Sequence, residues 1–286
     1  MTGKMLHKKI ITGVFLCLLV MASYADGAKK DITIAIMPCS DIIMTFKKFN
    51  PLATYLETKT GLTIELLVPK DYSEFESALK NNEIDFVFMD PHTYVKLDRY
   101  FKKNAIITSL NREGTPDQYG VVIVSKDSTI KNIGDLKGKT VMFGSKLSSS
   151  RWIAARSLFE ENGINIDKDL KSYSNGGCCE DIAFNVYLKA VDAGVVCDHF
   201  LEEHSEKQEE LGINAKQLNI IGKTKAVPTR IFVARKGVSD DIVTKIDNAL
   251  LSLDRTKPEH AKILYPAELG GFQRAKDEQY DSLRNL

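Results

Sequence analysis

Three consecutive serines stand where the chain could bind an anion. Ser148, Ser149 and Ser150 follow the short apolar run "TVMF" and precede "RWIAARSLFEENG", whose apolar residues recur at helical spacing. The serines are therefore expected where a strand turns into a helix, and the first N–H groups of a helix have no partner within it. Hydroxyls and amides there can donate to a tetrahedral oxyanion, and Arg151 can add a charge-assisted contact. The same pattern also fits a helix that is simply capped by a serine.

A second strand-to-helix turn, "DPHTYV", carries Tyr94 and His92. A phenol projecting from such a turn can donate to the same oxyanion as the serines. Tyrosines at these places are also often half-buried core residues, with the ring packed and the hydroxyl bonded elsewhere. His92 is a further candidate for contacting the ligand, although a histidine at such a place is more often a structural residue.

Four cysteines follow the first 25 residues: Cys39, Cys178, Cys179 and Cys197. In an exported protein such cysteines favour disulfides, and four allow three pairings. We expect one bridge between Cys197 and either Cys178 or Cys179, with the remaining two able to pair if Cys39 reaches the cleft. A metal site that combines these thiols with a histidine ranks lower, because their spacing matches no zinc pattern.

Acidic side chains lie next to these cysteines. Glu180 and Asp181 stand at an expected helix start, where the helix dipole favours acids without any ligand. Asp198 ends an expected strand and is the better candidate for contacting a cationic part of a ligand. The five histidines are scattered, and no nucleophile, base and orienting acid form a set. The sequence therefore predicts no enzyme, and it indicates neither a metal nor a cofactor.

Residues 1–25 have the pattern of a secretory signal peptide. Lys4, Lys8 and Lys9 precede a short apolar stretch, and Ser23 and Ala25 are small residues suited to a cleavage site. We expect cleavage before residue 26 and export of the remainder. Removal of the leader lowers the 39 basic residues to 36 against 38 acidic ones. This near balance does not favour nucleic acid or a membrane surface as a partner.

The rest of the chain alternates expected strands and helices. Strands are predicted at 31–37, 62–68 and 83–89, and helices at 46–61 and 71–82, before a second series of the same kind. Extended segments near 120 and 227 join the two series. We therefore predict an α/β protein of two lobes, 26–121 with 228–286 (lobe I) and 122–227 (lobe II). Each lobe is expected to have a mainly parallel sheet flanked by helices, with a ligand cleft between the lobes.

Several stretches taken in order resemble one family. They are "NPLATYLETKTG", "NNEIDFVFMDPHTYV", "IGDLKGKTVMFGSKLSSSRW", "KAVDAGVVCD" and "LGGF". Over nearly all of the chain after the leader, the sequence resembles the PhnD-like phosphate, phosphite and phosphonate-binding proteins of ABC importers. These are type 2 periplasmic binding proteins, so the resemblance implies the two-lobed fold that closes on its ligand.

The resemblance also implies roles for particular residues. The turn Ser148–Ser150 would hold a phosphorus oxyanion, Tyr94 would assist, and Asp198 would meet an amino group of the ligand. The chain departs from the family pattern at Arg151 and Asp90, where relatives carry glycines, and at "CCED". Phosphonate, phosphate and phosphite therefore stay open as ligands.

The implied role is that of a periplasmic solute-binding protein. It would act as a monomer and deliver its ligand to an ABC permease in the inner membrane. Three alternatives remain: a sensor that presents the closed lobes to a membrane receptor, an enzyme with a cysteine nucleophile, and a thiol-metal carrier.

Overall fold

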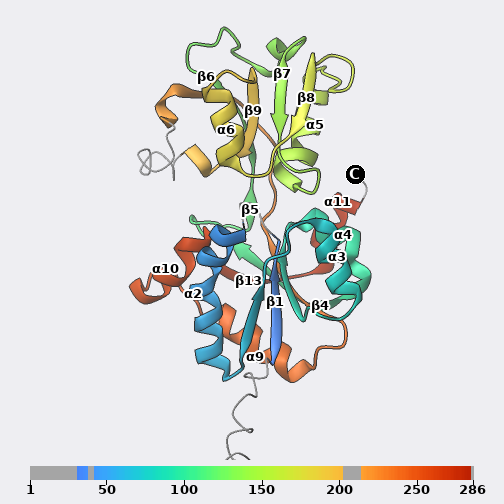
Figure 1. Cartoon of the computed structure of the whole chain (residues 1–286), viewed down its shortest axis with the longest axis vertical. Helices are drawn as coiled ribbons and strands as arrows, with labels where there is room; N and C mark the ends of the chain where they lie inside the picture. The colour runs from blue at the N-terminus through green and yellow to red at the C-terminus, as the bar shows by residue number, and fades with distance from the viewer. Residues whose placement is uncertain (1–30, 38–41, 202–213, 285–286) are drawn as a thin grey trace, which may run out of the picture.

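Two lobes stacked end to end make up the computed structural model of the chain (Figure 1). The structure describes residues 31–37, 42–201 and 214–284. The predicted signal peptide and Cys39 lie outside these ranges, so both expectations stay predictions. None of the helices within the described ranges has the length and apolar character that crossing a bilayer requires.

Lobe I is built on a six-stranded sheet with the order β13-β4-β12-β3-β1-β2. Strands β1 and β3 lie inside the sheet, and all of their residues are buried. The six strands are β1 (Ile32–Ile36), β2 (Ile64–Leu67), β3 (Phe86–Met89), β4 (Phe101–Leu110), β12 (Ile231–Arg235) and β13 (Gly271–Ala275).

Helices cover both faces of this sheet. On one face, Phe49 and Leu56 of α2 (Ile42–Thr60) pack with Ile246 of α9 (Asp240–Leu251) and with α10 (Pro258–Leu264). On the other face lie α3 (Tyr72–Lys80), α4 (Pro91–Leu97) and α11 (Asp281–Arg284). The apolar sides of these helices are buried against the strands, and each fully buried large side chain contributes about 1.5–3 kcal/mol.

Lobe II has a five-stranded sheet with the order β10-β6-β9-β7-β8. Helix α5 (Ala155–Glu161) covers one face and α6 (Cys179–Tyr187) covers the other. The strands are β6 (Gly120–Ser125), β7 (Thr140–Phe143), β8 (Ser172–Asn175), β9 (Ala193–Cys197) and β10 (Leu218–Lys223). Short helical turns complete the lobes at Asp98–Tyr100, Ile133–Leu136, Ala215–Gln217, Tyr265–Ala267 and Asp277–Tyr280.

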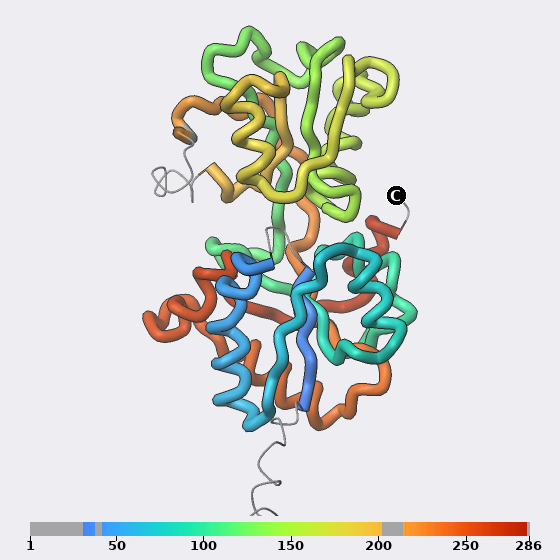
Figure 2. Tube along the Cα trace, in the orientation of Figure 1, coloured from blue at the N-terminus to red at the C-terminus, as the bar shows by residue number. Residues whose placement is uncertain are grey.

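Two short strands join the lobes where the sequence predicts crossings. β5 (Asp117–Gln118) and β11 (Val227–Pro228) pair antiparallel, and Figures 1 and 2 show these segments running side by side between the lobes. The Gln118 side chain also donates to the Pro228 carbonyl over 2.8 Å. Because Gly120 already pairs with Cys197, the sheet of lobe II begins slightly before the predicted boundary at 122.

Both sheets are mixed, which corrects the expectation of mainly parallel sheets. β1 pairs parallel with β2 and β3, whereas β12 and β13 pair antiparallel with their neighbours. In lobe II, β6 is antiparallel to both β9 and β10. For β6 and β12 the reason is the double crossing: a strand that enters a lobe from the hinge runs opposite to the strands that end at the cleft. The carboxyl ends of β1, β3, β7 and β9 still point to the cleft, where α/β sheets bind ligands.

A candidate ligand cleft between the lobes

The three-serine turn forms the lobe II wall of the cleft. Strand β7 ends at Phe143, and Ser148 caps a π-helical turn, Ser149–Ala154, that continues into α5. The Ser148 hydroxyl accepts a hydrogen bond from the Arg151 N–H over 3.2 Å. Ser149 and Ser150 are 0% and 1% exposed. The predicted strand-serine-helix arrangement is therefore present, with a wider first turn than expected.

Two glycines allow this turn to pack closely. A Cβ at Gly144 would lie 2.5 Å from the Cβ of Arg151, and a Cβ at Gly120 would lie 2.6 Å from the Ser150 carbonyl oxygen. Both distances are shorter than real side chains tolerate. Glycine at these positions lets the turn fold back on the end of β7 and on the first residue of β6.

A cavity of about 350 Å³ lies against the turn. Its walls include Ser148, Ser150 and Arg151 from lobe II and Asp90 and Arg230 from lobe I and the crossing segment. Arg151 is only 5% exposed, and one of its guanidinium nitrogens donates to the Gly177 carbonyl over 3.1 Å. Other charged residues on the cavity wall are Lys70, Asp71 and Asp181.

Asp90 links lobe I to the serine turn. It caps α4, and its Oδ1 accepts from the His92 N–H over 2.9 Å. Across the cleft, the Ser149 N–H lies 3.1 and 3.0 Å from the two carboxylate oxygens, and the Ser149 hydroxyl donates to Oδ1. Burial raises the pKa of Asp90, against these hydrogen bonds and the charge of Arg230, which lower it.

His92 joins this contact through its backbone. Its N–H also donates to the Ser149 hydroxyl oxygen over 3.1 Å. The imidazole is buried, and its Nδ1 has no hydrogen-bond partner among the residues that the structure describes. Burial, followed by the positive charge of Lys96, lowers the pKa of His92. The residue therefore supports the turn, while its ring lies within the protein.

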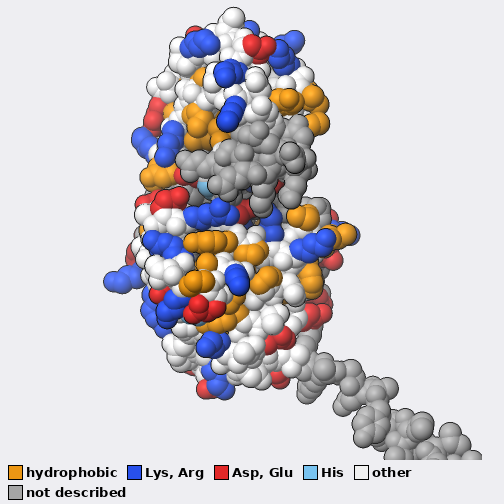
Figure 3. All heavy atoms as spheres, turned by 90° about the vertical axis from the view of Figure 1, so that its left-hand side faces the viewer, with side chains coloured by type: hydrophobic (Ala, Val, Ile, Leu, Met, Phe, Trp, Pro, Cys, Tyr) orange, Lys and Arg blue, Asp and Glu red, His pale blue; other side chains and the backbone are white. Residues whose placement is uncertain are grey.

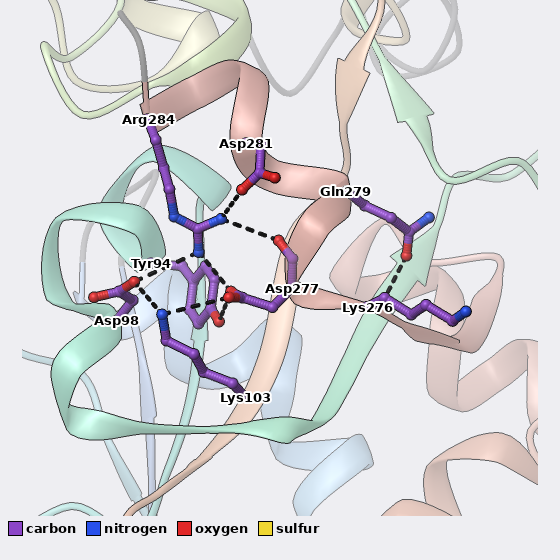
Figure 4. Close-up of polar contacts among 8 residues, drawn as sticks. All are labelled: Tyr94, Asp98, Lys103, Lys276, Asp277, Gln279, Asp281 and Arg284. Carbon is purple, nitrogen blue, oxygen red and sulfur yellow. Dashed lines mark hydrogen bonds and ion pairs between the residues drawn. The ribbon is translucent and has the colours of Figure 1, made fainter.

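Tyr94 lies away from the cavity, so its expected contact with the ligand stays a prediction. Its side chain is fully buried in lobe I and its hydroxyl donates to Asp277 Oδ1 over 2.5 Å. Figure 4 shows Tyr94 within a network of Asp98, Lys103, Asp277 and Arg284. The ring packs edge-on against Tyr280, with centroids 5.5 Å apart. This packing directs the phenol toward Asp277.

Asp198 occupies a different part of the cleft. It lines a cavity of about 510 Å³ together with His199 and Glu268, and its Oδ1 lies 3.5 Å from His199 Nδ1. Glu268 of lobe I lies 3.6 Å from His199 Nε2 and 2.7 Å from Lys48 Nζ. Figure 3 shows basic, acidic and histidine side chains together at the lobe boundary on one face. Arg230 and Cys197 line both cavities, so the two belong to one cleft.

The three cysteines of lobe II, Cys178, Cys179 and Cys197, line this cleft. Cys178 caps α6, and Cys179 Sγ accepts from the Cys197 N–H over 3.2 Å. Burial raises the pKa of Cys178 to about 12. A hydrogen bond with Cys197 lowers the pKa of Cys179, helped by the charges of Arg151 and His199. The structure thus places Cys179 beside Cys197, and the bridge itself stays a prediction.

A metal centre would need more ligands than the described residues bring together. Within those ranges, no three side chains of His, Cys, Asp or Glu lie close enough to hold an ion.

Sequence reasoning missed two residues that matter here. Asp90 was visible only as a departure from a glycine, and Arg230 only as part of an extended crossing segment. Both reach the cavity because the lobes pack together, which no local pattern encodes.

The fold and the cleft define a two-lobed binding protein with its ligand site between the lobes. Residues 34–280 match the family described as "ABC transporter, phosphonate, periplasmic substrate-binding protein". The chain belongs to this family, which is a family of substrate-binding components of ABC importers.

Individual relatives agree with this assignment. The phosphonates-binding periplasmic protein of Escherichia coli is 24% identical over 296 residues, covering 100% of this chain and 85% of its own. The phosphate-import protein PhnD of Mycolicibacterium smegmatis is 22% identical, covering 84% and 80%. The structure of PhnD1 from Prochlorococcus marinus in complex with methylphosphonate has a TM-score of 0.76 at 18% identity, covering 89% and 96%. That structure shows the same fold.

Proposed function

We propose that this protein captures a small phosphorus oxyanion, a phosphonate, phosphate or phosphite, for an ABC importer. The observation that supports this most strongly is the buried three-serine turn beside a cavity with basic side chains, in a chain of this family. Relatives whose names specify phosphonate or phosphate agree with the ligand class.

In this proposal the ligand lies in the cavity between the lobes. The hydroxyls of Ser148 and Ser150 donate to its oxygens, and the guanidinium groups of Arg151 and Arg230 offset its charge. The two crossing strands act as the hinge about which the lobes close. Asp198 lies at the other cavity of the cleft, where it can contact a substituent of a longer ligand.

The remaining parts of the proposal concern export and assembly. Residues 1–25 are removed as a signal peptide, and the mature protein works as a monomer in the periplasm with a permease of the inner membrane. It binds its ligand without chemical conversion. N-terminal sequencing of the exported protein tests the first point, with residue 26 expected first.

The test of the ligand site is calorimetry with methylphosphonate, phosphate and phosphite. We expect Ser150→Ala to weaken binding about tenfold or more, because a hydrogen bond to a charged group is lost. Ser157→Ala is the matched control, since Ser157 lies on α5 and donates to the Ile153 carbonyl of the turn that precedes it. Undiminished affinity of Ser150→Ala would refute the role of the turn, and absence of binding to all three anions would refute the ligand class.

A further inference from the structure

The Asp90 carboxylate already occupies part of the serine turn. It receives the Ser149 N–H at 3.0–3.1 Å, the Ser149 hydroxyl and the His92 N–H at 2.9 Å. An ionised carboxylate accepts hydrogen bonds and donates none. The donors of Ser149 are therefore committed to a protein carboxylate, while Ser148 and Ser150 still line the cavity.

The carboxylate is held firmly in this place. Asp90 is the N-cap of α4, so a rotation of its side chain would release the donors of both His92 and Ser149 at once. Unpaired donors in a buried site are costly. A ligand in the cavity is thus expected to lie beside Asp90 rather than to replace it.

Charged side chains from several elements line the cavity in which such a ligand would lie. Basic side chains of the cavity come from the loop before α3, from the serine turn and from the crossing segment. They are Lys70, Arg151 and Arg230. The acidic side chains of the cavity are Asp71, Asp90 and Asp181. His92 of α4 lies next to Asp90, to which its N–H donates. The basic groups can offset the negative charge of one ligand, but the ionised Asp90 carboxylate still has no hydrogen to donate.

We propose that Asp90 is a specificity-determining residue that selects tetrahedral oxyanions carrying a hydroxyl hydrogen. Two acceptor oxygens repel each other at hydrogen-bond distance, whereas a P–OH group can donate to the Asp90 carboxylate. The hydrogen stays on the ligand oxygen and Asp90 stays ionised. Singly protonated phosphonate, phosphate and phosphite meet this condition, and sulfonates and sulfate do not. The inference rests on the proposed function and narrows its ligand class.

A matched pair of anions tests this selection. In mildly acidic solution methylphosphonate keeps one proton, so methylphosphonate and methanesulfonate have the same charge and nearly the same shape. They differ by one hydroxyl hydrogen. Calorimetry on the wild-type protein should give an affinity for methylphosphonate about tenfold or more above that for methanesulfonate.

Asp90→Asn should reduce this preference to near equality, mainly by improving methanesulfonate binding, because the amide nitrogen can donate to a sulfonate oxygen. Asp71→Asn is the matched variant, since Asp71 is another carboxylate on the cavity wall. It should shift the two affinities together and leave their ratio unchanged. Asp90→Gly, which restores the glycine of the family pattern, gives a second measurement if the asparagine variant unfolds.

The outcomes separate the two proposals. A ratio that Asp90→Asn leaves unchanged, or that Asp71→Asn changes as much, overturns the role of Asp90. If the wild type binds neither anion and Asp90→Asn binds both, Asp90 is an internal competitor of the ligand, which also overturns the selection but keeps the serine turn as the site. If the wild type and both Asp90 variants bind neither these anions nor phosphate, the proposed function itself fails.

Discussion

Two carboxylates of lobe I meet lobe II across the cleft, and their partners differ in kind. Asp90 is held by two backbone N–H groups and a hydroxyl, none of which carries a net charge. Glu268 lies 2.7 Å from Lys48 Nζ and 3.6 Å from His199 Nε2. In the first contact, Asp90 accepts hydrogen bonds from uncharged donors of both lobes. In the second contact, Glu268 lies among side chains that carry positive charge.

The pKa values of the two acids move in opposite directions. Burial acts to raise both, and for Asp90 it outweighs the hydrogen bonds from Ser149 and His92. For Glu268 the hydrogen bond with His199 and the charge of Lys48 prevail, so its pKa lies well below the usual value. Dipoles position a carboxylate without fully offsetting its loss of water, whereas cations stabilise its charge. The Asp90 contact should therefore depend on geometry and the Glu268 contact on charge.

Truncation of Asp90 should give the largest effect. Asp90→Ala removes an N-cap and leaves buried donors of His92 and Ser149 unpaired, so we expect the free energy of unfolding to fall by about 2–3 kcal/mol. Asp90→Asn keeps an acceptor for the cap and should cost about 1 kcal/mol or less. Urea denaturation of the two variants measures the difference. Equal losses would show that charge, rather than the hydrogen-bonding geometry, holds this contact.

Glu268→Gln removes the charge from the second contact. We expect a loss of about 1 kcal/mol, because the Lys48 and Glu268 side chains are 26% and 25% exposed and solvent weakens the pair. The loss should shrink as salt concentration rises. Glu161→Gln, which breaks an exposed pair with Lys225 inside lobe II, is the control and should have little effect. A loss that is the same at low and high salt would contradict a charge-held contact.

The sequence predicts the serine turn, since strand, serines and helix are neighbours along the chain. It also predicts a strand-to-helix turn at "DPHTYV", and the structure places the start of α4 there, with Asp90 as its N-cap. It does not predict that the same carboxylate reaches Ser149, because 59 residues separate them and only the packing of the lobes brings them together.

Tyr94 and the sheets were less predictable for a related reason. The turn "DPHTYV" places a phenol near the cleft but does not fix its direction, which packing against Tyr280 and Phe101 decides. The order of strands and helices likewise indicates two α/β lobes. It does not specify that strands entering from the hinge run antiparallel to their neighbours.

The ionisation of the two carboxylates should change the stability of the protein in opposite directions. The pKa of Glu268 lies below its ordinary 4.5, so its contribution to stability is present above that value and is lost as pH falls through the folded pKa. The pKa of Asp90 lies above its ordinary 3.8, so its ionisation costs stability as pH rises from 3.8 through the folded pKa.

Urea denaturation of both variants in steps from acid to neutral pH measures these slopes. With rising pH, the stability of Glu268→Gln relative to the wild type should fall, and that of Asp90→Asn should rise. Slopes of the same sign would mean that both carboxylates lie in similar surroundings, which would remove the contrast between the two contacts.

Tyr94→Phe tests whether the side of α4 that carries Tyr94 takes part in binding, and it should leave ligand affinity unchanged. The change removes the hydrogen bond to Asp277, and we expect the free energy of unfolding to fall by about 1 kcal/mol. Affinity for methylphosphonate should stay within the error of calorimetry, because the hydroxyl points away from the cavity that Asp90 lines. Tyr173→Phe, which removes a hydroxyl bonded to Asp167 in lobe II, is the matched control. A tenfold loss of affinity in Tyr94→Phe alone would mean that the phenol turns into the cleft when ligand binds. In that case both Tyr94 and the N-cap residue Asp90 of α4 would contribute to the site.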